Sequence, residues 1–241
     1  MRRFVVLTVA TLVGVLAWAG YKGRWPAMPE PVTGIFPSGM AYARWGSGSK
    51  TLMLIPGGPG NNAPGGRFMG MMLGALRRRL GENGYSVWAV TRKRDMPKGH
   101  TIADMADDYA ELIRDEFGGR VDIAMCVSFG GHVGLALAAR HPDSFGHIVI
   151  AASGYRGDER ALALELEAAR LQSQDRTSEL GALMFRTQVP RNPIPGLDRV
   201  VGVVLGRLWT QGRHPYIRSD VLVEAEASRA YDARDLSLIH I

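Results

Sequence analysis

Apolar and polar positions change their spacing in a regular way between residues 40 and 153. Short, continuously apolar runs predict buried strands, while apolar positions three or four residues apart predict helices that pack along one side. The predicted strands are 40–45, 51–55, 85–90, 121–125 and 145–153, and the predicted helices are 68–80, a segment that begins at Thr101, and 129–141. Strands and helices that alternate in this way predict an α/β fold, in which a mostly parallel sheet carries helices on both faces.

The pattern becomes almost entirely helical after Gly154. Four helix candidates follow, at 158–172, 179–188, 196–212 and 219–231. A helical block after a strand-helix core predicts an inserted cap, so we expect a core at 39–153 and a helical cap at 154–235. Before the core, residues 26–38 contain prolines at 26, 29, 31 and 37 and predict an extended linker.

The first 25 residues form a separate apolar segment. Arg2 and Arg3 precede an uncharged run from Phe4 to Gly20, at the short end of the length that can span a bilayer, about 17 to 25 residues. The run also contains a small-x-small match to a signal cleavage site, so a membrane anchor and a cleaved signal are both open. Basic residues directly after the run favour the anchor. Either alternative predicts a membrane-anchored or exported protein with its body outside the cytoplasm.

Composition excludes several classes of protein. The 241 residues are 46% hydrophobic and 22% charged, which suits one sizeable hydrophobic core and excludes a disordered chain. The formal net charge is +6, but the basic residues are scattered and no aromatic residues interleave with a basic stripe, so we expect no nucleic-acid partner. The basic run at 92–94 is expected in a solvated loop at a strand's carboxyl end. Cys126 is the one cysteine, which rules out an internal disulfide.

The segment "IAMCVSFGG", residues 123–131, predicts a strand that enters a tight turn with Ser128 at its tip. A strand, a strained turn and a helix make a nucleophile elbow, which lifts a serine oxygen above the carboxyl end of the strand. Gly130 and Gly131 allow the strand and the helix to approach each other. The pattern has glycine two residues before the serine, where this chain has Cys126, a small and apolar substitute. Ser128 is therefore a candidate nucleophile.

A glycine-rich loop, residues 56–60, follows the predicted strand at 51–55. Attack on an acyl carbon requires N–H donors that are aimed at the developing oxyanion, and a glycine loop at a strand end can supply one. The N–H of Gly58 and the N–H of Phe129, directly after the serine, are the natural pair. The loop and the elbow together predict a site for acyl chemistry.

Three segments, "LIPGGPG", "VDIAMCVSFGGHVGLALAARHPD" and the helical block after "IVIAASG", resemble the α/β-hydrolase superfamily of esterases, lipases and peptidases. The glycine loop is similar to the His-Gly-Gly-Pro-Gly loop of the proline-iminopeptidase-like branch, with Pro56 in place of the histidine. The resemblance covers residues 40–235. It implies an α/β-hydrolase fold, Ser128 as nucleophile, Gly58 and Phe129 as oxyanion-hole donors, and a cap that lines the pocket for a small-molecule acyl substrate.

The resemblance implies a serine hydrolase that cleaves a carboxylic ester, or an amide or peptide bond, through an acyl-enzyme. It implies no metal and no organic cofactor, and serine at the nucleophile position argues against the dehalogenase and epoxide-hydrolase branches. Acyl transfer and hydrolysis of a carbon-carbon bond use the same fold and remain alternatives. A non-catalytic binding protein is a further alternative, because Cys126 and Pro56 both depart from the family's pattern.

The residues that would activate Ser128 are not found in this chain. In α/β-hydrolases the triad acid and histidine follow the cap in chain order, so we expect a fold that is incomplete at the C-terminus and holds neither of them. Four histidines are better explained as packing or surface residues: His132, His141, His147 and His214. The last six residues, 236–241, match the translation of a transposase adapter used in DNA sequencing libraries, so we expect a non-native tail on a truncated chain.

We therefore expect the 241-residue chain to be catalytically inert. A serine without its base loses most of the catalytic gain, so hydrolysis of p-nitrophenyl acetate should stay within about twofold of that by the Ser128→Ala variant. Turnover by the purified chain that this variant abolishes would contradict the expectation. A natural stop codon directly after Ile241 would contradict the truncation.

Overall fold

The computed structural model describes residues 30–58, 60, 79–190, 194–209 and 214–236. The chain divides into two compact units. Of the described residues, one unit comprises 31–58, 60, 79–176 and 214–236, and the other comprises 30, 177–190 and 194–209. The first unit contains the sheet and every residue that the sequence predicts for the acyl-chemistry site.

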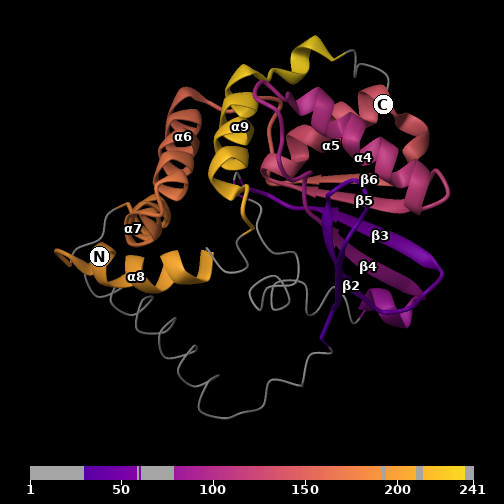
Figure 1. The fold of residues 1–241 in the computed structure, drawn as a ribbon, viewed down its shortest axis with the longest axis horizontal. Coiled ribbons are helices and arrows are strands. Elements are labelled where there is room, and N and C mark those ends of the chain that lie inside the picture. Colours follow the sequence, from indigo (N-terminus) through magenta and orange to yellow (C-terminus); the bar gives the residue numbers. More distant parts are fainter. Residues whose placement is uncertain (1–29, 59, 61–78, 191–193, 210–213, 237–241) are drawn as a thin grey trace. The chain divides into compact units, whose positions relative to one another are not determined.

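A six-stranded mixed sheet forms the centre of the larger unit (Figure 1). Its strands are β1 (Val32–Ile35), β2 (Ala41–Trp45), β3 (Lys50–Ile55), β4 (Tyr85–Val90), β5 (Val121–Val127) and β6 (Phe145–Ala151), in the order β1-β2-β4-β3-β5-β6. Strands β3 to β6 pair in parallel, whereas β1 pairs antiparallel with β2 and β2 antiparallel with β4. The expectation of a mostly parallel sheet is confirmed, and the carboxyl ends of β3, β4, β5 and β6 meet at one edge.

Both faces of the central strand β3 are buried, as its unbroken apolar sequence predicts. Met53 and Ile55 belong to the cluster that packs under α4 (Ile102–Glu116) and α5 (Phe129–Arg140), the two helices that cover one face of the sheet in Figure 1. Leu52 and Leu54 point to the opposite face, since successive side chains of a strand alternate. The helix expected at 68–80 lies mostly outside the described residues.

Part of the expected linker at 26–38 is a strand. Residues 32–35 form β1 and pair with β2 through a short turn in which the Phe36 N–H donates to the Met40 carbonyl at 2.9 Å. Pro31 and Pro37 flank these four residues, so neither proline removes a donor from the strand, and β1 occupies an edge where proline is tolerated. The prolines predicted an unpaired linker, whereas residues 32–35 are paired in the sheet.

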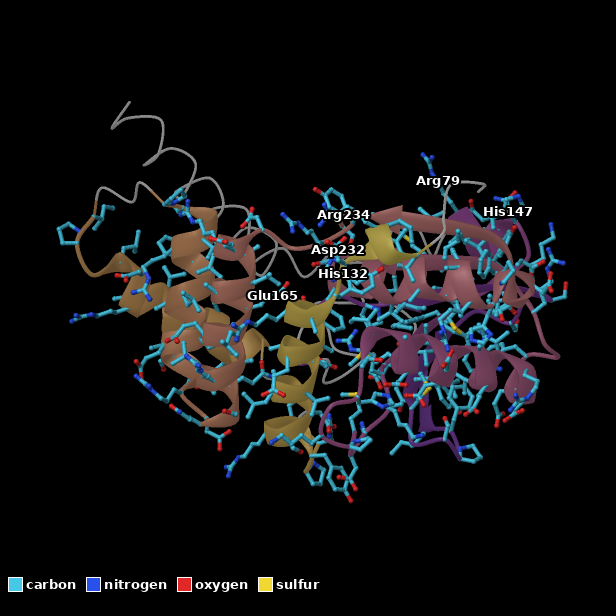
Figure 2. All side chains as sticks on the ribbon, turned by 90° about the horizontal axis from the view of Figure 1, so that it is seen from above. Arg79, His132, His147, Glu165, Asp232 and Arg234 are labelled. Atoms are coloured by element: carbon cyan, nitrogen blue, oxygen red, sulfur yellow. The ribbon has the colours of Figure 1, made fainter. Side chains whose placement is uncertain are left out.

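The helices after residue 154 belong to different units. Helices α6 (Glu159–Ser173) and α9 (Ile217–Ala230) lie in the unit with the sheet and pack on each other through Ala169, Val221 and Ala225. The Ser228 hydroxyl on α9 also donates to Glu165 Oε2 on α6 at 2.7 Å, and Figure 2 shows Glu165 directed toward α9. Burial raises the pKa of Glu165.

The smaller unit contains helices α7 (Thr177–Gln188) and α8 (Leu197–Trp209). Their backbones approach very closely, because a Cβ added to Gly181 would collide with the Gly202 carbonyl and one added to Gly206 would collide with the Thr177 carbonyl. An ion pair between Arg186 and Asp198, at 3.2 Å, also joins the two helices. That residues 154–235 act together as a cap stays a prediction.

Two short 3₁₀ helices complete the described elements, η1 (Pro142–Ser144) and η2 (Ala233–Asp235). Leu236, the first residue of the tail expected to be non-native, packs against the main core, and the rest of that tail lies outside the described residues. The segment at 1–25 lies outside them as well. Among the helices that the structure describes, none is both long and apolar enough to cross a membrane.

Candidate active site

Ser128 stands between β5 and α5, in the turn that the sequence predicts. Its backbone has φ 53° and ψ −122°, a conformation that costs a non-glycine residue about 1–3 kcal/mol. Two backbone hydrogen bonds hold it there: the Ser128 N–H donates to the Ala151 carbonyl at 2.9 Å, and the Gly131 N–H donates to the Ser128 carbonyl at 2.7 Å. The turn leaves Ser128 exposed at the carboxyl end of β5, where a substrate can reach it.

Gly130 and Gly131 occupy positions where a larger residue does not fit. A Cβ on Gly130 would collide with the carbonyl oxygen of Ile55 at the end of β3, and a Cβ on Gly131 would collide with the side chain of Ser153, just beyond β6. Helix α5 can therefore begin between the ends of β3 and β6, the two strands that flank β5. The close approach that the sequence assigned to these glycines is present.

Cys126 is fully buried and faces Gly134, two turns inside α5 from the serine. A Cβ on Gly134 would come within 2.5 Å of the Cys126 Sγ, so the missing side chain at 134 leaves the space that the sulfur occupies. Burial raises the pKa of the Cys126 thiol to about 12, which keeps it protonated and unreactive. The cysteine thus fills a packing position in the elbow and has a partner that accommodates it.

The glycine loop after β3 lies directly against the elbow. A Cβ on Gly57 would lie 3.0 Å from Ser128 Cβ and 3.6 Å from Ser128 Oγ, so the Gly57 backbone borders the serine. Gly58 has φ +120°, which side chains rarely allow. Phe129 is the first residue of α5, and the N–H groups of a helix's first turn have no acceptor within the helix. The roles of Gly58 and Phe129 as oxyanion donors stay predictions.

Arg92 does not lie in a solvated loop, contrary to the expectation for the basic run at 92–94. It is 2% exposed and forms an ion pair of 2.6 Å with Glu224 of α9, which is equally buried. Glu224 is not among the residues predicted from the sequence, although the sequence of α9 contains a signal for it. Asp220 and Glu224 recur at a spacing of four on the same side of the helix as the apolar residues Val221 and Ala225. Acids on an apolar helix face require buried partners.

Asp220 has partners of its own, in the loop after β4. Its carboxylate accepts the N–H groups of Asp95 and Met96, each at 3.0 Å. Burial raises the pKa of Asp220 to about 6, partly offset by these two hydrogen bonds. His214 Nε2 lies 4.0 Å from Asp220 Oδ2, and burial, together with the charge of Arg94, lowers the pKa of His214 to about 4.

None of the described histidines hydrogen-bonds to Ser128 Oγ, and no described carboxylate does so. His141 pairs with Asp107 at 2.6 Å on the surface, and His147 lies on β6 opposite Ile123, far from the carboxyl end of the sheet (Figure 2). His132 is buried in α5, where burial lowers its pKa and its ring lies 5.0 Å from that of Tyr231. No triad base or acid is identified in the described part of the chain.

Within the described ranges there is no cluster of three or more histidine, cysteine, aspartate or glutamate side chains that could hold a metal ion. What the site does assemble is a strained, exposed serine hydroxyl beside a glycine loop and a helix N-terminus. Attack on an acyl carbon uses a serine hydroxyl, N–H donors for the oxyanion and a general base, and the described residues offer candidates for the first two only.

This fold and site define a class of protein. The model of the alpha/beta hydrolase family matches residues 52–237, and the chain belongs to that family. Among curated proteins, the chain is 32% identical over 102 residues to Putative carbamate hydrolase RutD of Yersinia enterocolitica serotype O:8 / biotype 1B (strain NCTC 13174 / 8081). That match covers 42% of this chain and 35% of the relative, so it spans about a third of the relative's length.

Solved structures share the fold at low sequence identity. The enol-lactonase from Burkholderia xenovorans LB400 superimposes with a TM-score of 0.56 at 20% identity, over 82% of this chain and 72% of that one. The esterase EaEST from Exiguobacterium antarcticum superimposes with a TM-score of 0.57 at 18% identity, over 86% of this chain and 76% of that one. The α/β-hydrolase fold expected from the sequence is confirmed.

The contact between Cys126 and Gly134 predicts an energetic coupling. Gly134→Ala alone should lower the free energy of unfolding by about 1–3 kcal/mol, because the new methyl group overlaps the sulfur. In the Cys126→Gly background the same change should cost at least about 0.5 kcal/mol less. Urea unfolding of the four proteins measures the difference. Equal costs in the two backgrounds would mean that Gly134 does not accommodate the cysteine.

Asp220 and His214 should give opposite pH dependences of stability. Between about pH 4 and 6, Asp220 is protonated to a greater extent in the folded than in the unfolded chain, so its contribution to the free energy of unfolding falls as pH rises. His214 has a lowered pKa and is less protonated in the folded chain, so its contribution rises with pH. Relative to the parent protein, Asp220→Asn should therefore gain about 1–2 kcal/mol from pH 4 to 6, and His214→Gln should lose a similar amount. Thermal unfolding across this range provides the measurement, and parallel profiles would contradict it.

Proposed function

We propose that this protein is a serine hydrolase that cleaves a carboxylic ester through an acyl-enzyme on Ser128. The observation that carries the proposal is the contact between the elbow and the glycine loop, in which the Gly57 backbone borders Ser128 and the serine backbone is held at φ 53°. In the proposed reaction, Ser128 Oγ attacks the acyl carbon, the N–H groups of Gly58 and Phe129 stabilise the oxyanion, and the ester C–O bond breaks as the alcohol leaves with the serine proton. Water then attacks the acyl-enzyme, which releases the carboxylic acid and restores the Ser128 hydroxyl.

The structural relatives support an ester as the bond that is cleaved. An enol-lactonase and an esterase, as those proteins are named, share the fold, and both names denote attack on a carboxylic ester. The partial relative is named a carbamate hydrolase, so a bond with an acyl nitrogen is the secondary candidate. A small-molecule acyl substrate is proposed in either case, with no resident cofactor.

The departure at Cys126 weighs little against catalysis. Because Gly134 leaves room for the sulfur, the elbow keeps its backbone conformation with cysteine at this position. The general base and its acid are assigned to none of the described residues. We also propose that the segment at 1–25 places the protein at a membrane, with its body outside the cytoplasm, because a basic start precedes its apolar run.

The test uses the protein expressed from its complete reading frame. A fluorophosphonate probe should label Ser128, and p-nitrophenyl acetate should be hydrolysed faster than the corresponding p-nitroanilide. Ser128→Ala should abolish labelling and lower kcat/KM by at least about a thousandfold, because the covalent intermediate is lost. Mass spectrometry of the labelled protein identifies the modified residue.

Ser144→Ala provides a matched control. Ser144 immediately precedes β6, at the end of the sheet opposite the elbow, so its loss should leave labelling unchanged. Labelling or turnover that survives Ser128→Ala would contradict the assignment of the nucleophile. An inert parent protein would contradict the hydrolase proposal itself and favour a non-catalytic binding protein.

A further inference from the structure

The guanidinium of Arg92 holds two consecutive carbonyl groups of the glycine loop. Arg92 Nη1 donates to the Pro56 carbonyl oxygen at 2.8 Å, and Nη2 donates to the Gly57 carbonyl oxygen at 3.2 Å. Arg92 comes two residues after β4, and the Tyr109 hydroxyl anchors the end of that strand by donating to the Val90 carbonyl at 2.8 Å. The arginine therefore reaches the loop from a well-anchored position.

Glu224 holds the same assembly from the opposite side. Its Oε1 accepts the Nε–H of Arg92 at 2.6 Å, and its Oε2 accepts the N–H of Gly60 at 2.6 Å. One buried ion pair thus contacts the loop at Pro56, Gly57 and Gly60. Gln172 of α6 also packs against Gly60, where a Cβ would lie 2.5 Å from its amide, so the backbone at this position has little freedom.

Peptide geometry connects this clamp to the oxyanion hole. The carbonyl of Gly57 and the N–H of Gly58 belong to one peptide group, and in a trans peptide they point in opposite directions. With the Gly57 carbonyl turned toward Arg92, the Gly58 N–H is turned away from it. A charged donor on the carbonyl also polarises the peptide, which strengthens the N–H as a donor. Arg92 therefore sets both the direction and the strength of this N–H.

The second expected donor touches the same arginine. Arg92 Cζ lies 4.6 Å from the centre of the Phe129 ring, a cation–π distance, and the Phe129 side chain is 1% exposed. Phe129 is the residue whose backbone N–H follows Ser128. One guanidinium thus contacts the Gly57 carbonyl, which shares a peptide group with the Gly58 N–H, and the ring of Phe129, the other expected donor.

We propose that Arg92 and Glu224 are positioning residues for the oxyanion hole. Arg92 orients the Gly58 N–H through the Gly57 carbonyl. Glu224 holds the Arg92 guanidinium and the Gly60 backbone in place by accepting a hydrogen bond from each. The pair does not touch the substrate and does not exchange a proton with it. This inference rests on the proposed hydrolase function, because an oxyanion hole has a role only where Ser128 attacks an acyl carbon.

Asp220 supplies a matched comparison for Glu224. Both acids lie on α9, one turn apart, both are 2% exposed, and both accept backbone N–H groups from loops of the sheet-containing unit. Asp220 holds the loop at Asp95 and Met96, whereas Glu224 holds the loop next to Ser128. An effect on folding should be common to both acids, and an effect on the oxyanion hole should be confined to Glu224.

The experiment compares Arg92→Lys, Glu224→Gln and Asp220→Asn in the protein expressed from its complete reading frame. Lysine keeps the charge but cannot donate to both carbonyls and to Glu224 in the same fixed geometry. Arg92→Lys and Glu224→Gln should lower kcat for p-nitrophenyl acetate by about 10- to 100-fold, less than the loss of a whole oxyanion donor. KM should change by less than about threefold, because ground-state binding is not altered. The pH at half-maximal rate should shift by less than about 0.3 units, because the general base is not altered.

Asp220→Asn should lower the melting temperature about as much as Glu224→Gln and leave kcat within about twofold, with each rate corrected for the folded fraction. Equal losses of kcat in the two acid variants, or full activity in Arg92→Lys, would overturn this inference. The hydrolase proposal would still stand if the probe labels Ser128 in the parent protein. A parent protein that neither labels nor turns over would overturn both.

Discussion

The buried ion pair between Arg92 and Glu224 is the interaction on which the geometry of the candidate site depends. Taking two charges out of water costs several kcal/mol per ion, and the cost is recovered only where hydrogen bonds satisfy the buried donors and acceptors. Here the guanidinium donates to one carboxylate and two carbonyls, and the carboxylate accepts a further N–H. Removal of either partner would leave an unpaired buried charge, at a cost of about 3–5 kcal/mol.

The same pair makes α9 a structural part of the site. Arg92 follows a central strand, and Glu224 lies 132 residues later, beyond the helical block. Asp220, one turn earlier, holds a second loop at the carboxyl side of the sheet. Helix α9 therefore uses two buried acids to hold two loops, and the loop held by Glu224 is the one that borders Ser128. These contacts join α9 to the unit that contains the sheet, and α6 packs on α9.

Close backbone packing is the second constraint, and it supports the strained turn at Ser128. A Cβ on Gly57 would meet Ser128 itself, and Cβ atoms on Gly130, Gly131 and Gly134 would meet the end of β3, Ser153 after β6 and Cys126 in β5. Packing on these sides prevents the turn from relaxing, so the surrounding contacts keep Ser128 in its unfavourable backbone conformation. The consequence for function is an exposed hydroxyl in a fixed position above the sheet.

The sequence by itself determined the local elements and the position of the candidate nucleophile. Apolar periodicity and glycine placement are local properties, so the strands from β2 to β6, the helices from α4 to α9 and the turn at Ser128 could all be predicted from short segments. The strand β1 escaped prediction because its four residues lie between prolines, and only its pairing with β2 identifies it.

Only the tertiary structure decided which distant residues meet. The burial of Arg92, its pairing with Glu224 and the space that Gly134 leaves for Cys126 all depend on contacts between separate elements. A basic run at a strand end has the same local sequence pattern whether its side chains are solvated by water or paired with a buried carboxylate. The physical reason is that side-chain burial and pKa are set by the surroundings that the fold assembles, which a local pattern does not encode.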